Sequence, residues 1–285
     1  MDKFLINING ELANEENAKV SVFDRGFLYG DSVYEATRTF NRLPFQLDLH
    51  LDRLFWSAHK IDFSPTLTKE EIKGFIFQTI QASPHENISL RIILTRGTNT
   101  DLGLDPGLAI KNNIIIISKA IPDNPDWWLT KGLKIIFYRK KNSEKGALAK
   151  TGNYQENIMA LQVALAKGAH DALMVNSEDH VTEGTNSNAW LIKDGILYTP
   201  PLSDGLLDGL TRQAIIKMAK RNNVSLIEKS LSTKDFLDAS ECFITSTTRN
   251  LVPVTSIEGL PVGDGLPGKM TLQLLEMYKN FVTLE

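Results

Sequence analysis

Hydrophobic and polar positions alternate with two different periods in the first 120 residues. Between 47 and 61 the apolar residues fall at 47, 51, 54, 55, 58 and 61, which is the spacing of one helix face. Thr68 and Glu71 form a capping box that predicts a second helix through residue 82. Runs of aliphatic, β-branched and aromatic residues predict strands at 4–7, which enters an Asn9-Gly10 turn, and at 33–40, 88–95 and 114–117.

The pattern breaks at 121–126, where Pro122 and Pro125 remove backbone donors and fix φ. Beyond this break, helices are predicted at 157–166, 214–219 and 270–281, and strands at 133–138, 171–175, 189–192, 196–199 and 243–245. This order predicts an α+β protein with much antiparallel sheet. We expect an N-terminal domain at 1–120, an interdomain linker at 121–130 and a C-terminal domain at 131–285.

Composition narrows the class of protein. The 285 residues are 42% hydrophobic and carry 31 basic against 34 acidic side chains, without the basic excess of a nucleic-acid binder. The most apolar run, 114–117, is far too short to span a bilayer, and the N-terminus lacks a signal-peptide pattern. Cys242 is the single cysteine, and the five histidines do not cluster with carboxylates at metal-ligand spacing. We therefore expect a cytoplasmic protein with no metal, no nucleic acid and no membrane partner.

Short segments that carry candidate chemistry stand in a specific order. They are Phe-Asp-Arg-Gly-Phe-Leu-Tyr-Gly-Asp at 23–31, His-Leu-Asp-Arg-Leu at 50–54, Lys-Thr-Gly-Asn-Tyr at 150–154, Val-Thr-Glu-Gly at 181–184 with Ser-Asn at 187–188, Gly-Leu-Thr-Arg at 209–212 and Thr-Ser-Thr-Thr at 245–248. Together they resemble the class IV aminotransferases, the pyridoxal 5′-phosphate (PLP) enzymes of fold type IV. The resemblance covers nearly the whole chain. It implies a small N-terminal α/β domain, a larger C-terminal pseudo-barrel domain and a homodimer.

The resemblance assigns Lys150 to the cofactor. PLP needs a lysine amine to form a Schiff base, and then a base that moves a proton at the substrate Cα. A lysine beside a cationic cofactor in a partly desolvated pocket can fill both roles. Lys140, Lys141 and Lys145 lie nearby in the sequence but lack the following Thr-Gly-Asn-Tyr, so surface positions are expected for them.

Glu183 and Tyr154 are expected to contact the cofactor ring. The ring withdraws electrons while its nitrogen is protonated, and a carboxylate within hydrogen-bond reach favours that cation. Glu183 stands in Thr-Glu-Gly, as in the family, whereas Glu178 is expected to be a solvated turn residue. Tyr154 matches the family tyrosine that hydrogen-bonds the 3′-oxygen of the cofactor.

The cofactor phosphate favours cations and the backbone N–H groups of a helix N-terminus. A helix is expected to begin directly after Gly209, where the backbone can approach the phosphate closely. The resemblance assigns five residues to the phosphate: Arg53, Leu210, Thr211, Ser246 and Thr247. Position 53 lies off the apolar stripe of its helix, so an ordinary surface arginine is the alternative.

The candidates for binding the substrate carboxylate are Arg38, Tyr29, Arg91 and the amides of Thr247 and Thr248. Arg38 ends Tyr-Glu-Ala-Thr-Arg, which resembles the Phe-Glu-Gly-Ile-Arg of branched-chain enzymes with Ala36 and Thr37 in place of glycine and isoleucine. These changes predict a tighter, more polar pocket floor. Arg91 has a strand salt bridge as its alternative. Arg249 either lies near the substrate, where it favours an acidic acceptor, or points to solvent.

The combined pattern predicts a transaminase that moves the amino group of an aliphatic, L-branched-chain amino acid to 2-oxoglutarate. Residues 97–109 lack the arginine and histidine found in the familiar D-amino-acid aminotransferases, so a D-amino-acid transaminase is a less favoured alternative. An aminodeoxychorismate lyase, which releases 4-aminobenzoate and pyruvate, stays open through Thr37 and Arg249. A catalytically silent PLP-binding protein is the third alternative, and the joint presence of Lys150, Glu183 and Tyr154 argues against it.

Overall fold

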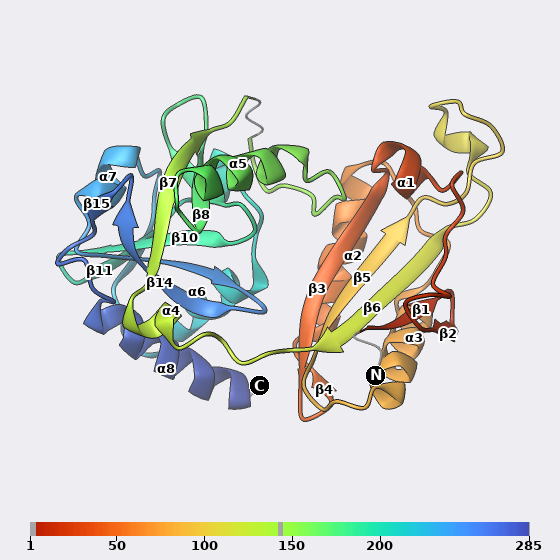
Figure 1. Ribbon diagram of the computed structural model, residues 1–285, viewed down its shortest axis with the longest axis horizontal. Helices are drawn as coiled ribbons and strands as arrows, with labels where there is room; N and C mark the ends of the chain where they lie inside the picture. Colours follow the sequence, from red (N-terminus) through yellow and green to blue (C-terminus); the bar gives the residue numbers. More distant parts are fainter. Residues whose placement is uncertain (1–3, 142–144, 285) are drawn as a thin grey trace. The chain divides into compact units, whose positions relative to one another are not determined.

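The structure is a computed structural model that describes residues 4–141 and 145–284, and it divides into two compact units (Figure 1). The first unit comprises Met1–Pro122 and Ala149–Asn153, and the second comprises Asp123–Leu148 and Tyr154–Glu285. The predicted α+β class is confirmed. The units differ from the domain bounds expected from sequence at 149–153, because this segment, which includes Lys150, hydrogen-bonds to one strand and one helix of the first unit. Most of the expected linker, from Asp123 on, belongs to the second unit.

The first unit is a six-stranded sheet with two long helices. Its elements are β1 (Leu5–Ile8), β2 (Glu11–Ala13), α1 (Arg25–Tyr29), β3 (Ser32–Phe40), β4 (Leu43–Pro44), α2 (Leu47–Lys60), α3 (Lys69–Ala82), β5 (Ile88–Thr95), the 3₁₀ turn η1 (Pro106–Leu108) and β6 (Asn113–Ala120). The strand order is β2-β1-β6-β5-β3-β4, and each neighbouring pair in this order is antiparallel.

The core of the first unit lies between this sheet and the helices α2 and α3. Leu51, Leu54 and Ala58 of α2 have no exposed surface, as the helical spacing predicts. Thr68 and Glu71 cap α3 reciprocally, so the predicted capping box is confirmed. From Glu35 onward, buried and half-buried positions alternate along β3, and the fully buried Glu35 places a charge at one of the inward positions.

The second unit is built on a larger sheet with helices packed on its outside. Its elements are α4 (Trp127–Thr130), β7 (Leu133–Arg139), α5 (Gln155–Ala166), β8 (Asp171–Val175), β9 (Val181–Gly184), β10 (Asn188–Lys193), β11 (Ile196–Thr199), the 3₁₀ turn η2 (Leu202–Asp204), α6 (Leu210–Arg221), β12 (Leu226–Glu228), α7 (Thr233–Leu237), β13 (Glu241–Ser246), β14 (Asn250–Ile257), β15 (Leu260–Pro261) and α8 (Lys269–Leu284).

This sheet closes on itself. Strands run in the order β10-β13-β14-β7-β8-β9, and β9 pairs back with β10, which gives the pseudo-barrel. The closing register pairs Glu183 of β9 with Asn188 of β10. One apolar cluster on the barrel strands includes Val181, Leu191 and Ile244, and a second joins the strands to α6 and α8. Closure leaves no open edge at this seam, so the backbone around Glu183 is fixed on both sides.

Sequence patterns do not predict β14, and the reason is Pro253. Proline removes a ladder donor and usually excludes a central strand. Here Pro253 pairs with Phe243 of β13, while the pairing of β14 with β7 begins only at Val254. The proline therefore lies beyond the segment that β7 pairs. The short elements α1 and β9 also escape prediction, since five and four residues are too few to show a period.

Candidate active site

Lys150 is fixed in the first unit by hydrogen bonds of its own backbone. Its N–H donates to the Ser57 hydroxyl of α2 at 3.0 Å, and its carbonyl accepts from the Tyr34 N–H of β3 at 2.9 Å. Two residues on, the Gly152 N–H donates to the Ser32 carbonyl at 2.9 Å. A Cβ at position 152 would collide with the Ser32 hydroxyl, so the glycine permits this approach to β3. The segment around Lys150 thus behaves as an added edge of the sheet.

The Lys150 amine lies over an aromatic ring. Its Nζ is 4.5 Å from the centre of the buried Tyr34 ring, and the Arg91 guanidinium lies 4.3 Å from the same ring. Arg91 is on β5, directly opposite Ala36, with an exposed side chain. Two cations over one ring place positive charge on the face of β3 that carries Tyr34 and Arg38. Arg38 is partly buried there, with its guanidinium 4.2 Å from the Phe40 ring.

Arg53 is a buried member of an ionic cluster on the other face of β3. Its Nε donates to Glu35 Oε1 at 2.7 Å and its Nη2 to Glu35 Oε2 at 2.8 Å. His50 Nδ1 lies 2.7 Å from Glu35 Oε2, and neither His50 nor Glu35 has any exposed surface. Residues 50, 53 and 57 are spaced as one stripe of α2, so this stripe carries the cluster and the Ser57 hydroxyl that holds Lys150. A surface position for Arg53 is excluded.

Charge pairing decides the protonation of this cluster. Burial raises the pKa of Glu35, but the Arg53 charge, the hydrogen bonds from Arg53 and the contact with His50 outweigh it and bring that pKa to about 2. Burial lowers the pKa of His50, and the Glu35 contacts only partly oppose this. Glu35 is therefore ionised and His50 neutral near neutral pH. In neutral His50 the Nδ1–H donates a hydrogen bond to the Glu35 carboxylate, so His50 Nε2 carries no proton.

Tyr29 and its neighbours organise the 99–105 loop. The Tyr29 hydroxyl donates to the Leu102 carbonyl at 2.7 Å. The buried Arg25 guanidinium donates to the carbonyls of Leu104 and Asp105 at 3.0 and 3.1 Å. Thr37 is fully buried and donates to the Phe45 carbonyl at 2.9 Å, so its polarity is satisfied inside the core of the unit and not on a pocket surface.

Glu183 lies at the barrel seam of the second unit. Its Oε2 accepts from the Leu207 N–H at 3.1 Å, and its side chain is half-buried. Asn188, its partner across the seam, donates to the Leu207 carbonyl at 2.9 Å. A Cβ on Gly209 would collide with Asn188 Oδ1. The seam, the 207–209 turn and the start of α6 therefore pack as one piece.

The N-terminus of α6 lies beside the end of β13. Gly209 precedes Leu210 without any side-chain cap, and Asn188, which touches Gly209, pairs with Thr245. The hydroxyls of Thr211 and Ser246 are buried and have no hydrogen-bond partner within residues 4–141 and 145–284. Uncapped amides and buried donors without acceptors suit an anion with several oxygens, such as a phosphate monoester. The residues present therefore fit the phosphate group of PLP.

The remaining candidates lie at turns of the second unit. Tyr154 precedes α5 and is half-buried. Thr247 and Thr248 lie in the turn between β13 and β14. Arg249, in the same turn, contacts Asp171 Oδ2 at 3.4 Å and Asn186 Oδ1. Its guanidinium is thus engaged within its own unit, and not simply directed to solvent.

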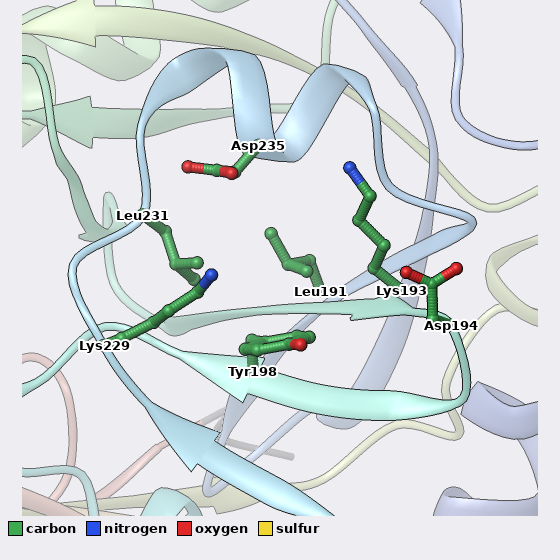
Figure 2. A pocket seen from close by; sticks show the side chains of 7 residues that line it. All are labelled: Leu191, Lys193, Asp194, Tyr198, Lys229, Leu231 and Asp235. Carbon is green, nitrogen blue, oxygen red and sulfur yellow. The ribbon is translucent and has the colours of Figure 1, made fainter.

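A hollow elsewhere on the second unit contains none of these candidates (Figure 2). It is lined by Leu191, Lys193, Asp194, Tyr198, Lys229, Leu231 and Asp235. Its two lysines and two aspartates balance, and Lys229 lies 4.7 Å above the Tyr198 ring, so nothing in it selects an anion or a cation. Within the described residues, no group of three His, Cys, Asp or Glu side chains could hold a metal ion.

Sequence reasoning missed Glu35 and His50, and also the loop contacts of Arg25. A signal for the first two was present, because a glutamate at an inward strand position needs a buried cation. His50 and Arg53 stand three residues apart on the helix that packs against this strand.

Comparison with known proteins decides the family. Residues 32–257 match the family described as amino-transferase class IV. The chain belongs to this family. It is 34% identical to a putative branched-chain-amino-acid aminotransferase of Methanocaldococcus jannaschii over 278 residues, which cover 98% of this chain and 96% of that protein. It is 31% identical to a D-alanine aminotransferase of Listeria monocytogenes, over 97% of this chain and 95% of that protein.

Solved structures of the family share the fold of this aminotransferase. The branched-chain amino acid aminotransferase of Escherichia coli matches with a TM-score of 0.90 at 27% identity, covering 97% of this chain and 93% of that one. The T.th. branched-chain enzyme with pyridoxamine 5′-phosphate matches with a TM-score of 0.88 at 27% identity, covering 98% and 94%. The predicted fold type IV and the aminotransferase activity are thereby confirmed, for a class whose substrates are amino and oxo acids and which depends on PLP. In the described part of the chain, no helix is long and apolar enough to cross a membrane.

Proposed function

We propose that this aminotransferase binds PLP through Lys150 and transfers the amino group of a branched-chain L-amino acid to 2-oxoglutarate. The observation that carries the proposal is the fixed setting of Lys150: three backbone hydrogen bonds hold the 150–152 segment against β3 and α2. A surface lysine needs no such support. The identity of the donor rests on the branched-chain enzymes that the chain resembles.

Each candidate residue has a defined task in this proposal. Lys150 would carry the cofactor as a Schiff base and, once displaced by substrate, move a proton between the substrate Cα and the cofactor carbon that it had occupied. Glu183 would keep the ring nitrogen protonated, and Tyr154 would donate to the 3′-oxygen. Bound PLP supplies a cationic conjugated ring that withdraws electrons from the bonds at Cα.

The phosphate would be bound by two kinds of group. Arg53 supplies the charge, and the amides of Leu210 and Thr211 supply donors at a helix N-terminus. Ser246 and Thr247 would add hydroxyls and amides. The two buried hydroxyls without partners, those of Thr211 and Ser246, support this assignment because a phosphate oxygen would satisfy each of them.

The substrate carboxylate would be bound by Arg38 and Arg91, with Tyr29 and the amides of Thr247 and Thr248 as further donors. Arg38 and Arg91 lie on adjacent strands, and their cations face the side of β3 that carries Tyr34. Arg249 would favour a dicarboxylate acceptor, in competition with its contacts to Asp171 and Asn186. We further propose a cytoplasmic homodimer in which the 97–106 loop contributes to the site of the partner subunit.

The first test is an absorbance spectrum of the purified protein before and after addition of single amino acids. A Schiff-base band in the violet that gives way to the near-ultraviolet band of the pyridoxamine form with L-leucine, and not with D-alanine, supports the proposal. The opposite result would favour the D-alanine activity named for the Listeria relative. Pyruvate release without an added 2-oxo acid would indicate the lyase instead. If no band forms with added PLP, the assignment of Lys150 is wrong.

A further inference from the structure

A complete ionic cluster is buried next to Lys150, and the proposed chemistry uses only one of its three members. Arg53 is assigned to the phosphate, whereas Glu35 and His50 have no task yet. Both side chains are fully buried, and His50 Nδ1 lies 2.7 Å from Glu35 Oε2. A buried charged network is often no more stabilising than a well-packed apolar one of similar volume. Its presence on the helix stripe that holds Lys150 therefore calls for a functional explanation.

We infer that Glu35 is a positioning residue for the cofactor phosphate: it holds the Arg53 guanidinium in one orientation and fixes the tautomer of His50. This inference deepens the proposed function and rests on it. Glu35 would act through Arg53 and never touch the cofactor itself.

The hydrogen-bond geometry supports this role. Glu35 Oε1 accepts from Nε of Arg53, and Oε2 accepts from Nη2, at 2.7 and 2.8 Å. Two parallel bonds of this kind define the plane of the guanidinium as well as its position. A single hydrogen bond, or a lysine in place of Arg53, would leave the cation free to rotate. The arginine therefore meets an incoming phosphate with its orientation already set, which reduces the ordering cost of binding.

His50 prevents the carboxylate from turning away. Its Nδ1–H donates to Oε2, the same oxygen that Nη2 uses, so three donors converge on the two oxygens of Glu35. With the proton on Nδ1, the buried Nε2 is an acceptor, and it has no hydrogen-bond partner in the described part of the chain. This open atom is an acceptor and does not itself bind a phosphate oxygen, so the role of His50 is to hold the Glu35 carboxylate in place.

Charge compensation is the competing role for Glu35. A carboxylate beside Arg53 cancels part of its positive charge, and this weakens anion binding at long range. If compensation dominated, removal of the charge would tighten phosphate binding. If orientation dominates, removal loosens it. The sign of the effect therefore decides between the two roles.

The test is the variant Glu35→Gln, studied by titrating PLP and pyridoxal separately into the cofactor-free protein. Pyridoxal has the same reactive carbonyl but lacks the phosphate. Glutamine offers one acceptor oxygen to three donors, and its NH₂ group opposes one of them. We expect the preference for PLP over pyridoxal to fall about 10- to 100-fold, the loss of one or two charge-assisted hydrogen bonds. The affinity for pyridoxal itself should stay unchanged. Glu70→Gln, which removes an exposed carboxylate of the same unit, is the matched control.

Three results would overturn the inference. The affinities for PLP and pyridoxal would fall together if Glu35 only supported the fold. The preference for PLP would stay constant if Arg53 needed no orientation, and would rise if compensation dominated. A wild-type protein that forms no Schiff-base band with PLP overturns the proposed function instead, which separates the two failures.

A second variant covers the case in which Glu35→Gln does not fold. Arg53→Lys keeps the charge but cannot donate the two parallel hydrogen bonds that Arg53 makes to Glu35. It should lower the preference for PLP over pyridoxal to a similar degree, with circular dichroism confirming the fold. An Arg53→Lys protein with the wild-type preference shows that a point charge suffices, and it rejects the role of Glu35.

Discussion

The two units hold their candidate cofactor residues by opposite means. In the first unit, the groups around Lys150 are ionic and mutually paired: Glu35 is bound by Arg53 and His50 in a fully buried cluster. In the second unit, the groups are neutral and open: the hydroxyls of Thr211 and Ser246 are buried without partners among the described residues, at the uncapped start of α6. In the first arrangement the hydrogen bonds among Glu35, Arg53 and His50 form without a ligand, although the acceptor His50 Nε2 stays open among the described residues, whereas the donors of the second arrangement lack an acceptor.

The first unit therefore presents side chains whose orientation is already fixed, whereas the second unit presents hydrogen-bond donors that a ligand can still engage. Paired charges cost little further ordering when a ligand arrives, so the first unit offers a preset geometry. Unpaired buried donors carry a desolvation cost that a phosphate would remove, so the second unit should gain stability on binding. Removal of a member of the paired cluster should therefore change the stability of the protein with or without cofactor, whereas removal of one of the two open hydroxyls should matter mainly in the loaded protein.

The largest effect is expected from Lys150→Ala. Without the amine, no Schiff base can form and no base remains to move the Cα proton, so turnover should fall by at least about 10³-fold. The visible band should be lost while the fold is kept. Lys145→Ala is the control, because that lysine makes an exposed ion pair with Glu178. If Lys145→Ala abolished the band and Lys150→Ala kept it, Lys145 and not Lys150 would hold the cofactor.

Acid should weaken the first unit through Glu35. The folded pKa of about 2 lies below the ordinary value of 4.5, so the carboxylate stabilises the fold fully above 4.5 and loses this contribution as the pH falls toward 2. The size of the contribution is about 3 kcal/mol. Urea unfolding of the wild type and of Glu35→Gln at several pH values measures it. The gap between their unfolding free energies should narrow below pH 4.5, and two parallel curves would contradict the charge pairing.

His50 should add to the acid sensitivity at higher pH. Burial holds the pKa of His50 below 6.5 in the folded protein. Below pH 6.5 the unfolded chain therefore binds a proton at His50 more readily than the folded chain, so the free energy of unfolding declines as the pH falls. Because of His50, the loss of stability in acid should begin at a higher pH than the loss that comes from Glu35 alone.

A glycine in each unit offers a smaller, steric contrast. A Cβ at Gly209 would collide with Asn188 Oδ1 at the start of α6, whereas one at Gly74 in α3 meets nothing within 4 Å. Gly209→Ala should cost about 1–3 kcal/mol of unfolding free energy and weaken PLP binding, because the helix start must move. Gly74→Ala should instead stabilise the protein by about 0.5–1 kcal/mol. Thermal or urea unfolding of the two variants checks both signs, and equal effects would refute the close approach at Gly209.

Much of the fold could be predicted from sequence because its signals are local. The helical spacing at 47–61, the capping box at Thr68 and the turn after residue 8 each depend on neighbours within a few residues. The start of α6 after Gly209 follows from a local signal of the same kind. Strand β14 could not be predicted because Pro253 is tolerated through the register of β7, a partner more than a hundred residues away in sequence.

The candidate site also contains residues that local sequence motifs predict and residues whose placement depends on long-range packing. Lys150 and Glu183 stand in short motifs, so a family resemblance finds them without any structure. The placing of 149–153 against β3 and α2 has no local signal, since it depends on hydrogen bonds to Ser32, Tyr34 and Ser57. The inward position of Glu35 signals a buried cation, but the identity of that cation depends on the packing of α2 against β3, which no local pattern gives.

The smallest effect contrasts two buried threonines. Thr37 donates to the Phe45 carbonyl, so Thr37→Val leaves that acceptor unpaired and should cost about 1–2 kcal/mol with or without cofactor. The Thr211 hydroxyl has no partner among the described residues, so Thr211→Val should change the stability of the cofactor-free protein by less than about 0.5 kcal/mol. Its cost should appear only on loading, as a PLP affinity lower by about five- to tenfold. Unfolding of both variants with and without PLP measures the difference. If Thr211→Val destabilised the cofactor-free protein as much as Thr37→Val, its hydroxyl would already be satisfied, and the second unit would be as complete without a ligand as the first.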